Sequence, residues 1–123
     1  MLKDKSSSAI VAVSDLGRAR DFYETTLGLP LERTVSDCLL CFRTGGSLLN
    51  VYQSEFAGTN KANAVVWDCG NEVDAIVAEL KGKGVTFDYF DGIDRDGDVH
   101  VSDGMRLAWF RDPDGNFLHL TGD

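Results

Sequence analysis

The chain has 123 residues, is 43% hydrophobic and carries a formal net charge of −8. This length and composition favour one compact globular domain with a buried core. The acidic charge repels phosphate backbones and anionic lipids, so we expect neither nucleic acid nor a membrane as a partner. No apolar run approaches the ~18 residues of a membrane span, and the run at residues 9–13 is shorter than a signal-peptide core of roughly 7–15 residues. We therefore expect a cytoplasmic protein.

The three cysteines are an odd number, which argues against a disulfide framework. Cys38 and Cys41 have the C-x-x-C spacing, but residues 38–43 read as a strand. Side chains three residues apart on a strand point to opposite faces, and a structural zinc site would need two more ligands near by. We interpret the pair as small core residues.

The first half of the chain predicts one strand, one helix and then three strands. Asp15 suits the N-cap of a helix, and apolar residues recur with helical period over residues 16–27. Gly28 suits a left-handed helix end. Gly45 and Gly46 indicate a hairpin turn between the last two strands. The four predicted strands are residues 8–13, 31–35, 39–44 and 48–53.

The second half repeats this order after a polar linker. Asn71 is the expected cap of a second helix, whose apolar face runs over residues 73–80. Residues 91–104 are rich in Asp and Gly and read as a mobile loop, long enough to cover a pocket as a lid. A Pro-Asp-Gly turn at residues 113–115 predicts a final hairpin. The predicted strands are residues 64–69, 86–90, 105–111 and 116–121.

The two halves match one another as an internal repeat. A shift of 56 residues aligns the helix starts and helix ends, and a shift of 69 residues aligns residues 46–51 with 115–120. A repeated supersecondary unit normally cannot bury its apolar face alone, so both copies belong to one domain. We expect module 1 at about residues 8–53, a linker at 54–62 and module 2 at about 63–121. The shifts make Ser8 equivalent to Ala64, and Asn50 equivalent to His119.

Three motifs carry a resemblance to a known family. They are V-S-D-L-G-R-A-R-D-F-Y-E-T-T-L-G-L at residues 13–29, K-G-K-G-V at 81–85 and W-F-R-D-P-D-G-N-F-L-H-L at 109–120. In this order and spacing the chain resembles the vicinal oxygen chelate superfamily, which includes glyoxalase I, extradiol dioxygenases and bleomycin-type resistance proteins. The resemblance implies an α+β fold of two βαβββ modules that roll a curved sheet around a shared cavity. It also implies a homodimer.

Metal-using members of that superfamily hold their ion on the first and last strands of each module, usually through His or Glu. Carried over residue by residue, these positions are Ser8, Asn50, Ala64 and His119. A divalent metal needs several imidazoles or charged oxygens, but this set offers one imidazole, one amide, one hydroxyl and one methyl group. We therefore expect no metal and no other cofactor.

The candidate ligand-binding residues are those expected to face the cavity, together with Trp109. They are Ser8, Asn50, Tyr52, Ala64, Asp68, Trp109, Phe117 and His119. Strand parity places Asp68 on the same face as Ala64, where a carboxylate near His119 could act as acid or base. An ordinary strand-end carboxylate in water is the alternative reading of Asp68.

The aromatic residues divide by strand parity. Trp67 has the parity opposite to Asp68 and should pack under the second helix. Parity leaves open which way Trp109, Tyr89 and Phe90 face. Ligand sites are mostly apolar with a few placed polar groups, whereas aromatic residues in strands are commonly core.

The sequence thus predicts a metal-free protein that binds an aromatic or hydrophobic organic small molecule, as the drug-sequestering members of the superfamily do. The alternative is an enzyme of the same superfamily, a lyase, dioxygenase or isomerase, with His119 as ligand or general base and Asp68 as its partner. A third reading is a dimerisation or regulatory domain without a ligand. The sequence identifies no ligand or substrate.

Overall fold

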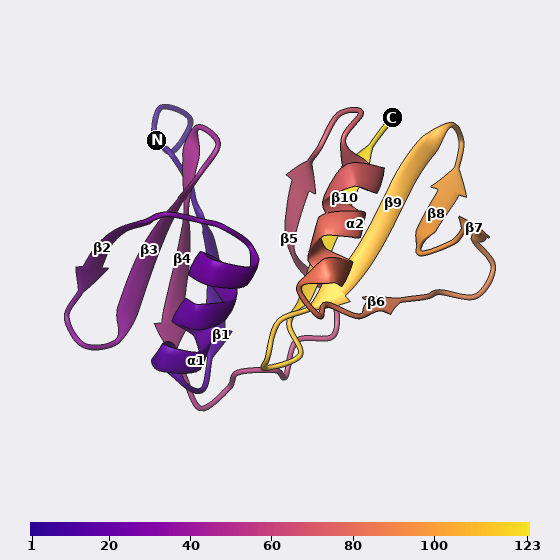
Figure 1. Ribbon diagram of the computed structural model, residues 1–123. Coiled ribbons are helices and arrows are strands. Elements are labelled where there is room, and N and C mark those ends of the chain that lie inside the picture. Colours follow the sequence, from indigo (N-terminus) through magenta and orange to yellow (C-terminus); the bar gives the residue numbers. More distant parts are fainter. The chain divides into compact units, whose positions relative to one another are not determined.

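The structure is a computed structural model that describes residues 1–123, and the chain forms two compact units, Met1–Ala57 and Gly58–Asp123. Each unit combines one sheet with one helical segment (Figure 1). The α+β fold class predicted from the sequence is confirmed. No helix has both the length and the apolar character needed to cross a bilayer. A cavity shared by the two modules of a single domain stays a prediction.

Unit 1 contains a four-stranded sheet. In chain order its elements are β1 (Ala9–Val13), α1 (Leu16–Arg20), a π-helical segment η1 (Asp21–Thr26), β2 (Leu31–Val35), β3 (Leu39–Thr44) and β4 (Ser47–Gln53). The strand order is β1-β4-β3-β2, with β1 parallel to β4 and the other pairs antiparallel. The predicted strands agree with these bounds to within one residue.

The first helix begins as the sequence predicts and then widens. The Asp15 carboxylate accepts a hydrogen bond from the Arg18 backbone N–H at 3.0 Å, which confirms the predicted N-cap. After Arg20 the helix changes to π geometry, and the Leu27 N–H donates to the Phe22 carbonyl, five residues back, at 2.9 Å. The prediction of a regular α-helix over the whole segment was wrong.

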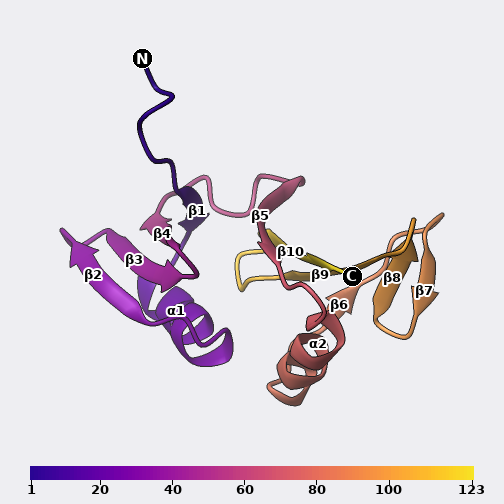
Figure 2. The same ribbon diagram turned by 90° about the horizontal axis from the view of Figure 1, so that it is seen from above.

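The two faces of the unit 1 sheet differ. One face packs against the helical segment, where the Tyr23 ring lies 5.9 Å from that of Phe42 and both side chains are buried. Figure 2 shows the helical segment on one side of this sheet. The ladder register places Ile10, Asn50 and Tyr52 on the opposite side, here called the open face of unit 1. Ile10 is 60% exposed, so this face keeps apolar side chains in contact with solvent.

Unit 2 contains a larger sheet. Its elements are β5 (Asn63–Asp68), α2 (Val73–Gly82), β6 (Phe87–Asp88), β7 (Asp94–Asp96), β8 (Val99–Ser102), β9 (Met105–Arg111) and β10 (Phe117–Gly122). The strand order is β5-β10-β9-β8-β7, and β6 also pairs with β9. Only β5 and β10 are parallel.

Two local predictions for unit 2 were wrong. The residue at the start of α2 is Glu72 rather than Asn71, and no side chain caps this helix end. Residues 91–104 contain the hairpin β7–β8 rather than an irregular loop, because β8 pairs with β9 and extends the main sheet. Unit 2 therefore has more strands than one βαβββ module.

Two sets of ion pairs connect the β7–β8 hairpin to the rest of unit 2. Lys81 on α2 lies 2.7 Å from the carboxylate of Asp98, between β7 and β8. On β9, Arg106 contacts Asp74 of α2 at 2.7 Å and Asp96 of β7 at 3.1 Å. These contacts fix the hairpin beside α2, so the prediction of a mobile segment does not fit the structure.

Candidate functional site

The face of the unit 2 sheet that points away from α2 carries the candidate site. Here His119 of β10 lies between Trp109 of β9 and Val66 of β5, its direct partners in the two ladders. The open face of unit 2 consists of these three residues with Asp68, Phe117 and Thr121. Its residues alternate along the strands with the buried set that faces α2, which includes Leu118 and Leu120.

His119 and Trp109 form a stacked pair. Their ring centroids are 4.4 Å apart and their planes are inclined by only 12°. Trp109 also meets the edges of Phe90 at 4.9 Å and His100 at 5.1 Å. Because these rings leave Trp109 only 9% exposed, Trp109 supports His119 from the neighbouring strand, and His119 is the member of the pair that a ligand can reach.

The hydrogen bonding of His119 fixes which nitrogen carries its proton. Nδ1 lies 3.0 Å from the carbonyl oxygen of Ala108, and a carbonyl only accepts, so Nδ1–H is the donor. Burial lowers the pKa of His119 below its usual value of 6.5, against the smaller opposing effect of the Ala108 hydrogen bond. At neutral pH the ring is therefore uncharged, and Nε2 presents a lone pair.

A second histidine packs against the same aromatic cluster. His100 of β8 is fully buried, with 0% exposure, and its Nε2 accepts a hydrogen bond from the Phe90 backbone N–H at 3.0 Å. A backbone N–H only donates, so Nε2 is unprotonated and the ring proton sits on Nδ1, which has no hydrogen-bond partner. This contact holds Phe90 against Trp109.

Asp68 lies close to His119 in the register of the β5–β10 ladder, but its hydrogen bond is to a different group. Asp68 is the ladder partner of Thr121, two residues beyond His119 on β10. Its Oδ1 accepts from the Gly70 backbone N–H at 3.1 Å. No hydrogen bond joins Asp68 to His119, so the acid–base pairing of these residues stays a prediction.

The other end of the open face is polar. Phe117 is opposite Arg111 in the ladder, and the Arg111 guanidinium carbon lies 5.7 Å from its ring centre. The Nε and Nη2 atoms of Arg111 both donate to the carboxylate of Asp88, at 3.1 and 3.0 Å. The β5–β10 ladder shifts register beside Phe117, which leaves Ala64 at an irregularity rather than opposite His119.

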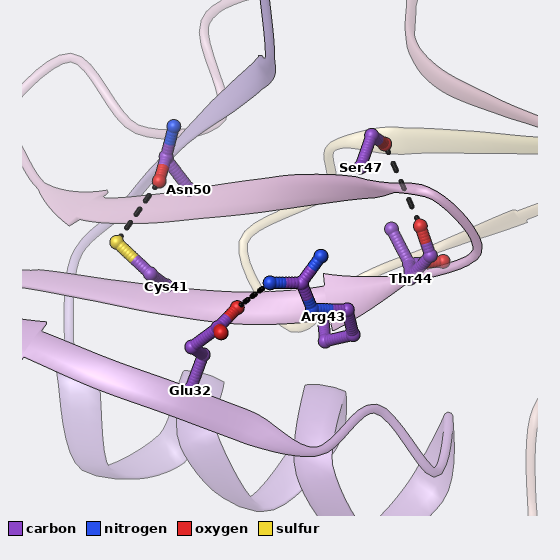
Figure 3. A network of polar contacts seen from close by, with 6 residues as sticks. All are labelled: Glu32, Cys41, Arg43, Thr44, Ser47 and Asn50. Atoms are coloured by element: carbon purple, nitrogen blue, oxygen red, sulfur yellow. Dashed lines mark hydrogen bonds and ion pairs between the residues drawn. The ribbon is translucent and has the colours of Figure 1, made fainter.

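The open face of unit 1 holds the remaining predicted residues. Asn50 is the ladder partner of Ile10 and Cys41, and its Oδ1 accepts from the Cys41 thiol at 3.0 Å. Figure 3 shows the amide nitrogen of Asn50 directed away from Cys41, which leaves it free to donate. Tyr52 follows on the same face, whereas Ser8 is exposed and precedes β1.

The end of the β3–β4 hairpin is held by separate polar contacts. Arg43 forms an ion pair with Glu32 of β2, and the Ser47 hydroxyl donates to the Thr44 carbonyl at 3.5 Å (Figure 3). These contacts span the three antiparallel strands and do not involve Asn50. They stabilise the hairpin and leave the Asn50–Cys41 pair as the polar feature of this face.

Comparison with protein-family models identifies the chain. The family described as the Glyoxalase/Bleomycin resistance protein/Dioxygenase superfamily matches residues 6–120. The chain belongs to this superfamily. The recognition made from the three sequence motifs is confirmed. A comparison with curated proteins gave no match.

Solved structures of other superfamily members share the fold at low sequence identity. A lactoylglutathione lyase from Agrobacterium tumefaciens has a TM-score of 0.75 and 16% identity, with 97% of this chain and 93% of that one covered. A glyoxalase family protein from Enterococcus faecalis has a TM-score of 0.75 and 18% identity, with 98% and 99% covered. A glyoxalase/bleomycin resistance protein/dioxygenase from Alicyclobacillus acidocaldarius has a TM-score of 0.72 and 18% identity, with 97% and 91% covered.

The residues of this superfamily member do not fit the ion expected for metal-using members. No group of three or more His, Cys, Asp or Glu side chains gathers where it could bind an ion. At the positions that correspond to the metal ligands of metal-using members, Asn50 already accepts a hydrogen bond from the Cys41 thiol, and the Ala64 side chain has no atom that could bind a metal. His119 alone supplies a usual metal ligand. We therefore derive no chemistry through a metal.

Three residues of this site were not among the predicted ligand contacts. Val66 is 58% exposed beside His119, and Phe90 and His100 complete the surroundings of Trp109. Strand parity with Asp68 could have identified Val66. The alternation Val99-His100-Val101 is a weak strand signal within an Asp- and Gly-rich segment. No local signal indicated that the Phe90 backbone donates to His100.

Proposed function

We propose that this superfamily member binds a flat apolar organic molecule on the open face of unit 2, without a metal. The observation that carries the proposal is the His119–Trp109 stack, which places an uncharged imidazole on a rigid aromatic support. The exposed Val66 adds apolar area beside it. An apolar surface with one placed polar atom is typical of small-molecule sites.

The remaining predicted ligand contacts fit this proposal to different degrees. Phe117 and Asp68 belong to the same open face, whereas the largely buried Trp109 contributes mainly through its stacking on His119. Ala64 stands at the ladder irregularity. On unit 1, Asn50 and Tyr52 offer an amide donor and an aromatic ring, and Ser8 an exposed hydroxyl; we keep these three as proposed ligand contacts.

A thermal-shift and NMR screen of aromatic compounds tests the proposal. A ligand at about 100 times its dissociation constant adds roughly 2.7 kcal/mol to the free energy of unfolding. In two-dimensional 1H–15N NMR spectra, binding should shift the amides of β9 and β10 around His119. A screen in which no compound produces either effect would overturn the proposal.

A matched pair of variants locates the site. Val66→Asp places a charge beside His119 and should weaken binding at least tenfold, because the ligand would desolvate a carboxylate. Leu2→Asp introduces the same charge at an exposed position before β1, in unit 1, and should leave the affinity within about twofold. Equal losses in both variants would contradict the placement on unit 2.

A catalytic role for His119 is the second candidate. An uncharged imidazole with an available Nε2 at neutral pH is suited to accept a proton from a substrate. Asp68 accepts from the Gly70 N–H through Oδ1, so Oδ2 is the oxygen that remains to assist. Turnover that His119→Ala abolishes would support an enzyme, whereas binding without turnover supports sequestration of the ligand, as in drug resistance.

We also propose a cytoplasmic homodimer. The three cysteines are unpaired in the structure, which suits a reducing compartment. The apolar open face of unit 1, with Ile10 and Val35 exposed, offers area for association. Sedimentation equilibrium measures the assembly directly, and a monomer at micromolar concentration would contradict the dimer.

A further inference from the structure

The open face of unit 2 offers a hydrogen-bond acceptor at its centre. His119 uses its only ring proton on the Ala108 carbonyl, so the lone pair of Nε2 is what faces a ligand. No partner for Nε2 occurs within the chain. A ligand that covers His119 without donating to Nε2 would leave this acceptor desolvated and unpaired, which costs free energy.

The charged groups around Nε2 of His119 also disfavour an anionic ligand. Asp68, on the neighbouring strand, adds a carboxylate to the open face. Arg111, at the end of this face, has two of its nitrogens bound to Asp88, so this pair is close to neutral. Arg95 shares the same side of the sheet beyond His100, and its guanidinium lies over the Tyr89 ring. With a net charge of −8 for the whole chain, an anionic ligand would approach against the field.

The other ring proton in the cluster is out of reach. The Nδ1–H of His100 has no partner, but His100 is fully buried, with its ring against those of Trp109 and Phe90. It cannot serve as the donor for a ligand carbonyl or carboxylate unless these rings move. The accessible polar atom at the centre of the face therefore accepts and does not donate.

We propose that the ligand is a flat, neutral or cationic molecule that carries an N–H or O–H donor directed at Nε2 of His119. This inference rests on the function proposed above and adds the polarity of the ligand to it. Aromatic amines, phenols and N–H heteroaromatic compounds belong to this class. Carboxylates, and ring ethers of the same shape, do not.

Indole and benzofuran are suitable probes because they have nearly the same shape and differ in an N–H donor against an oxygen acceptor. Their dissociation constants for the 15N-labelled protein at pH 7.5 are measured by NMR titration, following the amides near His119. We expect indole to bind about 2- to 12-fold more tightly, the ratio that one net hydrogen bond supplies.

Two variants assign the preference to one atom. His119→Phe keeps a flat ring on Trp109 but removes the lone pair, so indole and benzofuran should bind equally. Thr86→Val makes a change of the same kind at an exposed position before β6, outside the open face, and should leave the ratio as in the wild type. A ratio that changes in Thr86→Val, or that His119→Phe leaves at the wild-type value, would overturn the assignment.

The wild-type protein provides a test without a variant. Protonation of His119 converts Nε2 from an acceptor into a donor, so the preference for indole should disappear as the pH falls below the titration of this ring. Equal binding at pH 7.5, or tighter binding of benzofuran, would overturn this inference and leave the proposed function standing. Binding of neither probe at millimolar concentration, together with a negative wider screen, would overturn both.

Discussion

The turn between β9 and β10 determines where His119 lies, and its central carboxylate can be tested directly. Asp112 Oδ1 accepts from the backbone N–H groups of Asp114 and Asn116 at 3.0 and 2.9 Å, and Oδ2 accepts from the Asn116 side-chain amide at 2.8 Å. Asp112 is 5% exposed and Asn116 is 4% exposed. The carboxylate thus satisfies three donors that water scarcely reaches.

Asp112→Ala removes all three acceptor contacts. A hydrogen bond to a charged group contributes about 1.5–3 kcal/mol, and bonds that share one carboxylate are not additive. We expect the free energy of unfolding to fall by about 3–5 kcal/mol, measured by urea denaturation followed by circular dichroism. Asp91→Ala, the same change at an exposed position, should alter it by less than about 0.5 kcal/mol.

Exchanging the side chains of Asp112 and Asn116 tests the hydrogen-bond geometry of the turn. Asp112→Asn keeps an oxygen for the two backbone donors but turns an amide toward the amide of Asn116, so it should also destabilise. Adding Asn116→Asp restores a donor opposite an acceptor and should recover most of the loss. A loss below about 1 kcal/mol for Asp112→Ala, or no recovery in the double variant, would refute this account of the turn.

Three further outcomes are expected. Burial lowers the pKa of His119. The contribution of the uncharged ring to the free energy of unfolding is therefore complete above the unfolded pKa of about 6.5 and is lost as the pH falls through the folded pKa. Urea titrations of the wild type and of His119→Gln over this pH range measure the contribution, and parallel pH profiles of the two proteins would contradict it. Gly122→Ala should cost about 1–3 kcal/mol, since a Cβ there would lie 2.1 Å from the Gly70 carbonyl oxygen; an unchanged midpoint in urea would disprove that contact. His100→Leu should speed hydrogen exchange at the Phe90 amide, whereas His100→Gln, which keeps an acceptor, should largely preserve its protection; identical exchange rates would show that this bond is absent.

The order of the elements was readable from the sequence because it depends on local periods. Alternating apolar residues gave the strands of unit 1 to within one residue, and Asp15 gave the start of α1. The same alternation predicted Trp67 on the helix side, and its ladder partner Leu120 is buried there. Parity is a property of consecutive residues, so a single sequence suffices for it.

Local patterns failed where a segment depends on distant partners. The strands β7 and β8 contain Asp and Gly residues that favour turns, yet β8 is a strand because β9 pairs with it. The widening of the first helix at residues 21–26 had no signal in the apolar spacing either. Trp109 could be assigned to a face only from its register with His119.

The sequence alone determined the superfamily, the α+β class and the poor set of metal ligands, because these follow from motifs and from the chemical nature of single side chains. Only the tertiary structure decided what His119 offers to a ligand. Its proton position depends on the Ala108 carbonyl, and its charge depends on burial against Trp109. Both residues belong to the neighbouring strand, so the state of the imidazole is set by strand pairing and packing.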